Sequence, residues 1–162
     1  MRTINEKFRS AIAEYFDRYT VIAPAMNGGK LDYMEVNSPD EIVWTNELPY
    51  KSPKEAVFPR VEALMRFADG TITPAQAPKP ILLLGAKPCD CAAMKVLDTV
   101  FTEGKVTDPF YKNRRDVLTV VCRGCESEKP GCFCSERGVD MRHSPDCDYF
   151  ITEDFEIVPA TK

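Results

Sequence analysis

Two apolar runs stand out in the second half of the chain. The first is ILLLGA at 81–86, and the second is VLTVV at 117–121. Each has the length of a strand that is buried on both faces. Between them, residues 91–101 repeat apolar side chains at three- and four-residue steps, the period of a helix. Buried strands alternating with a helix predict an α/β fold with a mixed, partly parallel sheet flanked by helices.

The N-terminal part shows shorter patterns. Apolar residues at helical spacing predict an amphipathic helix over 4–19. Two β-like runs on either side of NGGK at 27–30 predict a hairpin. Val43 and Trp44 are expected to add a short extended piece.

The next segments carry helix-start and loop signals. Residues 52–58 should open a short helix, because Ser52 can cap it and a proline follows at the first helical position. The run VEALMRFA at 61–68 predicts a return to helix. Residues 69–80 hold three prolines and a glycine, so we expect a loop there. A short helix over 108–115 and a strand over 148–152 complete the prediction.

Length and composition fit one ordinary soluble domain. We expect residues 1–162 to form a single α/β domain, with any internal seam near 69–80. The net charge is −4 and the pI is near 5.1, which argues against a nucleic-acid partner. The longest apolar run is too short to span a bilayer, and no signal peptide is visible. These features indicate a cytoplasmic protein, in which disulfides are not expected.

Cysteines provide the candidate chemistry. The chain has seven, of which four lie in CRGCESEKPGCFC and two lie in KPCDCAAM. Cys89 follows the first buried strand, and Cys122 and Cys125 follow the second, with Cys132 and Cys134 close behind. Sites in open α/β sheets form beyond the carboxyl ends of the strands. If the two strands are parallel neighbours, the sequence predicts a cysteine-rich loop region and a thiol site at that edge.

The residue types leave three kinds of site open. One 4Fe–4S cluster needs four thiolates, and Cys89 at a helix N-terminus could join others from 122–134. A structural zinc could use Cys122, Cys125, Cys132 and Cys134, which would make the protein a zinc-stabilised interaction module. A redox dithiol could use Cys122 and Cys125. We interpret Cys91 and Cys147 as spare or buried thiols and Asp90 as a helix cap, and no catalytic residue is predicted.

Several of these segments occur together in one known family. The segments are SPKEAVFP, LLLGAKPCDCAAMKVLDTVF, DPFYKNRR and GCFC followed by CDYFIT, over about residues 50–152. They resemble the family of sulfhydrogenase β-subunits, to which a component of anaerobic sulfite reductase also belongs. The resemblance implies a 4Fe–4S electron-transfer subunit of an oxidoreductase complex. It would relay electrons between a flavin- and NAD(P)H-binding diaphorase and a catalytic subunit, either hydrogenase or sulfite/sulfur reductase.

The resemblance also implies a ligand set. It places cluster ligands at Cys89, Cys132 and Cys134, with either Cys122 or Cys125 as the fourth. Asp98, Phe101, Asp108, Tyr111 and Arg115 are among the positions that it marks as scaffold. The chain departs from the family at Cys91, where an apolar residue is usual, and in its looser cysteine spacing. It has no ferredoxin motifs, so we expect this chain to lack the family's C-terminal ferredoxin-like module.

Overall fold

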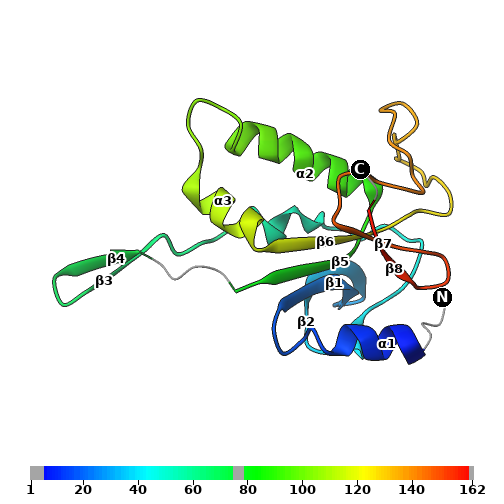
Figure 1. Ribbon diagram of the computed structural model, residues 1–162, viewed down its shortest axis with the longest axis horizontal. Coiled ribbons are helices and arrows are strands. Elements are labelled where there is room, and N and C mark those ends of the chain that lie inside the picture. Colours follow the sequence, from blue (N-terminus) through cyan, green and yellow to red (C-terminus); the bar gives the residue numbers. More distant parts are fainter. Residues whose placement is uncertain (1–5, 75–78, 161–162) are drawn as a thin grey trace.

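The computed structural model describes residues 6–74 and 79–160 and has helices on both faces of one main sheet (Figure 1). The helices are α1 (Glu6–Ala13), α2 (Pro88–Phe101) and α3 (Pro109–Asp116), with short 3₁₀ turns η1 (Pro39–Glu41) and η2 (Pro53–Ala56). The strands are β1 (Thr20–Asn27), β2 (Lys30–Val36), β3 (Met65–Ala68), β4 (Thr71–Pro74), β5 (Ile81–Ala86), β6 (Leu118–Arg123), β7 (Tyr149–Ile151) and β8 (Ile157–Pro159).

The main sheet has the order β2-β1-β5-β6-β7-β8. Strands β1, β5, β6 and β7 run parallel to one another, and β2 and β8 are antiparallel edge strands. The mixed, partly parallel α/β fold predicted from the sequence is therefore confirmed. The carboxyl ends of β5 and β6 lie at the same edge of the sheet. This is the arrangement on which the predicted thiol site depends.

Central strand β5 contributes to both halves of the core. All six of its residues are buried, and alternate side chains point to opposite faces. Leu82 and Leu84 pack with α1 residues on one face, and Leu83 packs on the α2 and α3 face. Burial on both faces explains why this strand reads as an uninterrupted apolar run.

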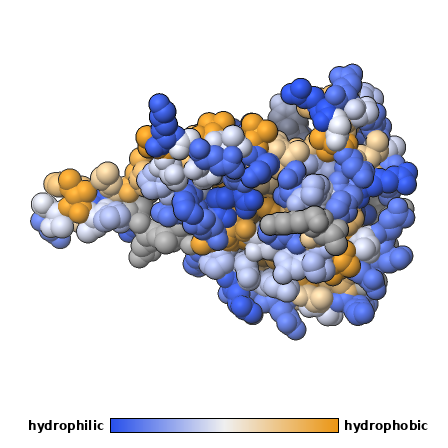
Figure 2. Space-filling model, turned by 45° about the horizontal axis from the view of Figure 1, so that its top comes forward, coloured by the Kyte–Doolittle hydropathy of each residue, from blue (hydrophilic) through white to orange (hydrophobic). Residues whose placement is uncertain are grey.

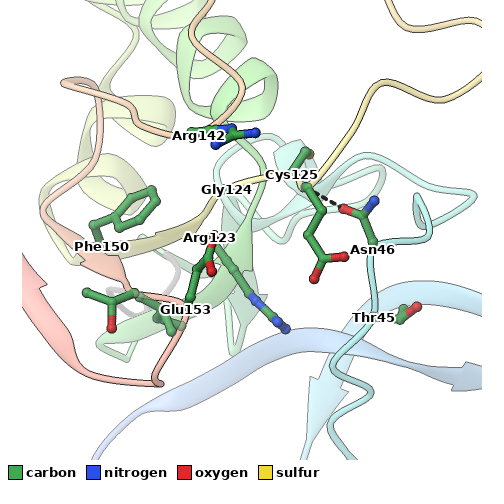
Figure 3. A pocket seen from close by; sticks show the side chains of 11 residues that line it. Thr45, Asn46, Arg123, Gly124, Cys125, Arg142, Phe150 and Glu153 are labelled. Atoms are coloured by element: carbon green, nitrogen blue, oxygen red, sulfur yellow. Dashed lines mark hydrogen bonds between the residues drawn. The ribbon is translucent and has the colours of Figure 1, made fainter. Parts of the chain in front are cut away.

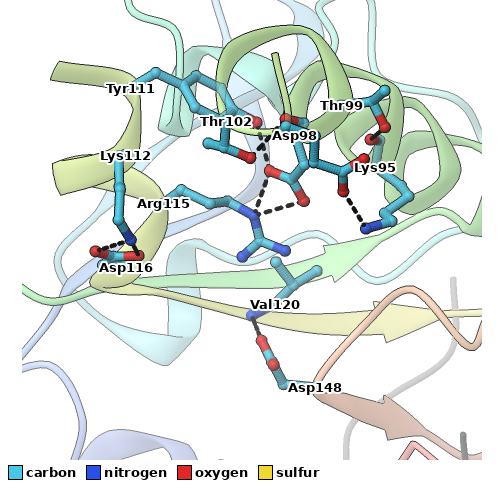
Figure 4. A network of polar contacts seen from close by, with 11 residues as sticks. Lys95, Asp98, Thr99, Thr102, Tyr111, Lys112, Arg115, Asp116, Val120 and Asp148 are labelled. Atoms are coloured by element: carbon cyan, nitrogen blue, oxygen red, sulfur yellow. Dashed lines mark hydrogen bonds and ion pairs between the residues drawn. The ribbon is translucent and has the colours of Figure 1, made fainter. Parts of the chain in front are cut away.

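A polar network holds α2 against α3 on the second face (Figure 4). The Asp98 carboxylate accepts hydrogen bonds from the Tyr111 hydroxyl at 2.8 Å and from the Arg115 guanidinium at 3.0 Å. Asp108 caps α3 by accepting bonds from the backbone N–H groups of residues 110 and 111. These contacts fix the helix layer over β6.

Three predicted elements differ from the structure. The first helix is described from residue 6 and ends at Ala13, and tight turns follow, with Tyr15 N–H bonded to the Ile12 carbonyl at 3.1 Å. The Phe16 N–H likewise bonds to the Ala13 carbonyl three residues back, so the four-residue bonding pattern of the α-helix has ended there. The helix predicted over 61–68 is wrong, because 65–68 is strand β3. Part of the predicted 69–80 loop is strand β4, and residues 75–78 lie outside the described residues.

Strands β3 and β4 form a separate hairpin that protrudes from the body (Figures 1 and 2). Asp69 and Gly70 make the turn with positive φ angles of 51° and 73°. Met65, Phe67 and Ile72 are 65%, 75% and 64% exposed. The alternation of residues 65–68 fits this strand as well as it fits a helix, and the Asp-Gly turn decides for the hairpin.

Shortening a buried side chain of β5 should destabilise the whole fold. We expect Leu83→Ala to lower the free energy of unfolding by about 2–5 kcal/mol, because Leu83 is 0% exposed and its truncation leaves a cavity. Val96→Ala is the control, since Val96 is 63% exposed and should change stability by less than about 0.5 kcal/mol. Urea unfolding followed by circular dichroism measures both. Equal losses in the two variants would contradict the assignment of β5 to the core.

Candidate functional site

Helix α2 presents Cys89 in its first turn, directly after β5. Pro88 occupies the first helical position, where no backbone hydrogen bond is lost. The Asp90 carboxylate accepts bonds from the Lys87 backbone N–H at 3.3 Å and from the Ser52 hydroxyl at 3.4 Å. The predicted capping role of Asp90 is therefore confirmed. This local structure holds the half-buried Cys89 at the positive end of a 14-residue helix.

The segment that leaves β6 is held in place at Cys125. Its backbone N–H donates to the Met141 carbonyl at 2.7 Å, and the next N–H donates to the Asn46 side chain at 2.9 Å (Figure 3). Gly124 permits this close approach, because a Cβ there would lie 2.8 Å from the Arg142 carbonyl oxygen. A glycine is required at this position by contact with the neighbouring backbone.

Cys132 and Cys134 lie in a turn that is held by hydrogen bonds between its own residues. The Lys129 backbone N–H donates to the Cys132 sulfur at 3.3 Å, and the Val139 N–H donates to the Cys134 carbonyl at 2.9 Å. The Lys129 ammonium also reaches Glu47 at 3.0 Å, which ties the turn to the body of the protein. Phe133, between the two cysteines, is 59% exposed.

Four cysteines interact at this edge of the sheet: Cys89, Cys125, Cys132 and Cys134. Burial raises the pKa of Cys89 to about 12, helped by the charges of Asp90, Cys134 and Cys125, and Cys89 is also hydrogen-bonded to Cys134. Burial likewise raises the pKa of Cys125, which interacts with Cys134 and Cys132. The structure thus brings together thiols that lie up to 45 positions apart in the sequence.

Cys122 does not belong to this group. It is 0% exposed in β6 and packs in the core on the α2 face, together with Cys91 and Cys147. Hydrogen bonds with Cys147 and Cys91 and then burial raise the pKa of Cys122. Hydrogen bonds from Cys122 and Cys91 lower the pKa of Cys147, because they stabilise its thiolate. The seven cysteines therefore divide into an outer group of four and an inner group of three.

Lys87 brings a buried positive charge beside the outer group. Lys87 is only 4% exposed, and its ammonium donates a hydrogen bond to the Thr45 carbonyl at 3.5 Å. Burial lowers the pKa of Lys87, whereas the nearby Cys125 sulfur opposes that shift. The sequence prediction missed this residue, since a lysine before a proline carries no signal of burial.

A small pocket of about 60 Å³ lies beside Cys125 (Figure 3). Its lining includes Asn46, Arg123 and Arg142. The Arg123 guanidinium lies 4.9 Å from the Phe155 ring centre and 5.5 Å from that of Trp44, so its position is set by aromatic contacts. The pocket is too small for a substrate and is part of the packing that supports the cysteine loop.

The described residues contain neither a preformed metal-ion site nor a helix that could span a membrane. Within residues 6–74 and 79–160, no group of three or more His, Cys, Asp or Glu side chains has the geometry of a metal-ion site. None of the helices in the same residues has the length and apolar character that crossing a bilayer requires.

Fold and site together define an α/β protein with a thiol-rich edge at the carboxyl ends of its parallel strands. Among curated proteins, the chain is similar to sulfhydrogenase 2 subunit beta of Pyrococcus furiosus, with 27% identity over 132 residues. The match covers 79% of this chain and 39% of that protein, so the chain spans about two fifths of its relative's length. This similarity confirms the resemblance predicted from the sequence motifs.

The other comparisons give no match. No family model matches the chain, and no solved structure matches it.

Removing the charge of Asp90 should make Cys89 more reactive. The Asp90 carboxylate disfavours the Cys89 thiolate, so Asp90→Asn should lower the pKa of Cys89. At pH 8 the alkylation rate of Cys89 in metal-free protein should rise about tenfold for each unit of that decrease. Iodoacetamide labelling followed by peptide mass spectrometry measures the rate.

Asp116→Asn is the matched control for this measurement. Asp116 is exposed, pairs with Lys112 at 2.8 Å, and ends α3 at the opposite edge of the sheet from Cys89. Its substitution should leave the labelling of Cys89 unchanged. If Asp90→Asn also leaves the rate unchanged, the Asp90 charge does not control this thiol.

Proposed function

We propose that this chain is an electron-transfer domain that holds one 4Fe–4S cluster through the outer cysteines, which are Cys89, Cys125, Cys132 and Cys134. The observation that carries the proposal is the convergence of one thiol following β5 with three thiols following β6. A cubane of this type takes one thiolate for each of its four irons. The donor set therefore fits the group in both number and chemistry.

The geometry favours Cys125 over Cys122 as the fourth ligand. Cys125 interacts with Cys132 and Cys134, whereas Cys122 is turned toward α2 and bonded to other core thiols. A ligand at Cys122 would have to break those bonds and leave the core. We therefore propose Cys125, and not Cys122, as the fourth ligand of the cluster.

Residues around the outer group suit thiolate ligands. When bound, the cluster would supply one-electron transfer, and the chain itself would set its charge environment. The Lys129 N–H already donates to the Cys132 sulfur, and such amide donors tune a cluster's reduction potential. Lys87 places a positive charge near Cys125. Metal binding requires loss of the thiol protons, whose removal burial opposes in the metal-free protein.

A role within a larger complex is supported by the relative and by the exposed edge of the site. The similar protein is named as a subunit of a sulfhydrogenase. We propose that the chain relays electrons between a flavin- and NAD(P)H-binding diaphorase and a catalytic subunit in the cytoplasm. Phe133 is exposed between two proposed ligands and offers an apolar contact for such a partner.

Single substitutions test whether the cluster is bound by the outer cysteines and not by the inner ones. Anaerobic reconstitution of the wild-type chain with iron and sulfide should give broad absorption near about 400 nm. Cys125→Ser should lose most of that absorption and of the bound iron, because one ligand of four is removed. Cys122→Ser is the matched control and should keep both. Absorption spectra with iron and sulfide analysis provide the measurement.

Cys89→Ser distinguishes the cluster from a zinc-stabilised interaction module. A cluster that uses Cys89 should be lost in this variant, whereas a zinc site confined to 122–134 would keep its metal. A colourless protein that takes up stoichiometric zinc, with or without Cys89, would overturn the proposed function. Cluster formation in Cys125→Ser combined with its loss in Cys122→Ser would overturn the ligand assignment alone.

A further inference from the structure

The inner cysteines form a connected group of three thiols that the proposed cluster does not use. Cys91, Cys122 and Cys147 are 0%, 0% and 8% exposed and belong to the same part of the core. Hydrogen bonding among the three contributes to the pKa shift of each thiol, and the Cys147 thiol donates to the Ser144 carbonyl at 3.3 Å. Sulfur atoms in mutual hydrogen-bond contact need only a small side-chain movement to form a covalent bond.

Two members of the group are held together by backbone as well. Strands β6 and β7 are neighbours, and the Asp148 N–H donates to the Val120 carbonyl at 3.0 Å. A backbone hydrogen bond from Cys122 also contributes to lowering the pKa of Cys147. Cys91 lies instead on α2, whose position depends on side-chain packing against the sheet. Cys122 and Cys147 are therefore the pair best placed for a direct link.

A bond between these two residues would join the two ends of the cysteine loop. The loop runs from residue 123 to residue 146 and contains Cys125, Cys132 and Cys134. Joining the ends of a loop lowers the conformational entropy of the residues between them. A link at Cys122 and Cys147 would restrain the loop in a protein that holds no metal.

We propose that Cys122 and Cys147 are a thiol-oxidation site that reacts with small-molecule disulfides to form an intramolecular disulfide. Cys147 reacts first, because at 8% exposed it is the least buried of the three. Its sulfur attacks one sulfur of the small disulfide, which forms a mixed disulfide at Cys147 and releases the other half as a free thiol. The Cys122 sulfur then attacks the Cys147 sulfur and displaces the second small thiol. Two electrons and two protons pass from the protein to the small disulfide.

Peptide mapping of the wild-type chain tests this site without any substitution. The folded protein is incubated with hydroxyethyl disulfide, quenched with acid, alkylated and digested with trypsin. Cys122 lies alone in the peptide DVLTVVCR, and Cys147 lies alone in the peptide that begins HSPDCDYF. We expect the main new product to be these two peptides linked, preceded in time by a mixed disulfide at Cys147.

Variants and unfolded protein supply the controls. Cys91→Ser should still form the link, whereas Cys147→Ser should leave Cys122 reduced. In urea the preference for this pair should disappear, because it depends on the fold. A main product that contains Cys91, or links only within 125–134, would overturn the proposal, and so would a mixed disulfide at Cys147 that never resolves. The result does not depend on whether the outer cysteines bind a cluster.

Discussion

The parallel pairing of β5 with β6 is the constraint on which both cysteine groups depend. Their register runs from Ile81 opposite Leu118 to Ala86 opposite Cys122, so both strands leave the sheet at one edge. An antiparallel pair would place the two exits at opposite ends of the strands, about 20 Å apart for six residues at about 3.3 Å each. Cys89 and the loop after β6 can meet only because the strands are parallel.

A bulge at the end of β5 then directs the chain into α2. The pairing with β6 shifts between Leu84 and Ala86, and Gly85 between them has a φ of 75°. That backbone angle is strained for residues with a Cβ, which explains the glycine. The Tyr33 hydroxyl donates to the Gly85 carbonyl at 3.0 Å and holds the bulge in place. Helix α2 can consequently begin at Pro88, two residues after the strand ends.

How much could be predicted from the sequence depended on whether one signal or several agreed. Strand β5 and helix α2 were predicted well, because a continuous apolar run marks the strand and apolar side chains at helical spacing mark the helix. Residues 61–68 were predicted wrongly, since a short apolar pattern fits helix and strand alike, and it is the turn at Asp69 and Gly70 that makes 65–68 a hairpin strand. The meeting of the thiols at one edge could be predicted from the order of strands and helices. The difference between Cys122 and Cys125 could not, because it depends on which face of the sheet each residue of β6 points to.

Helix phase and strand facing divide cysteines that are close in sequence. Cys89 and Cys91 are two residues apart, about 200° around a helix of 3.6 residues per turn, so they point in different directions. Cys122 faces the helix layer, whereas Cys125 has already left the sheet. A buried thiolate is costly, which suits Cys91 and Cys122 to staying protonated in the core, where their hydrogen bonds lower the pKa of Cys147. Three of the four outer cysteines are only half-buried, so they can carry the negative charge of a ligand set at lower cost.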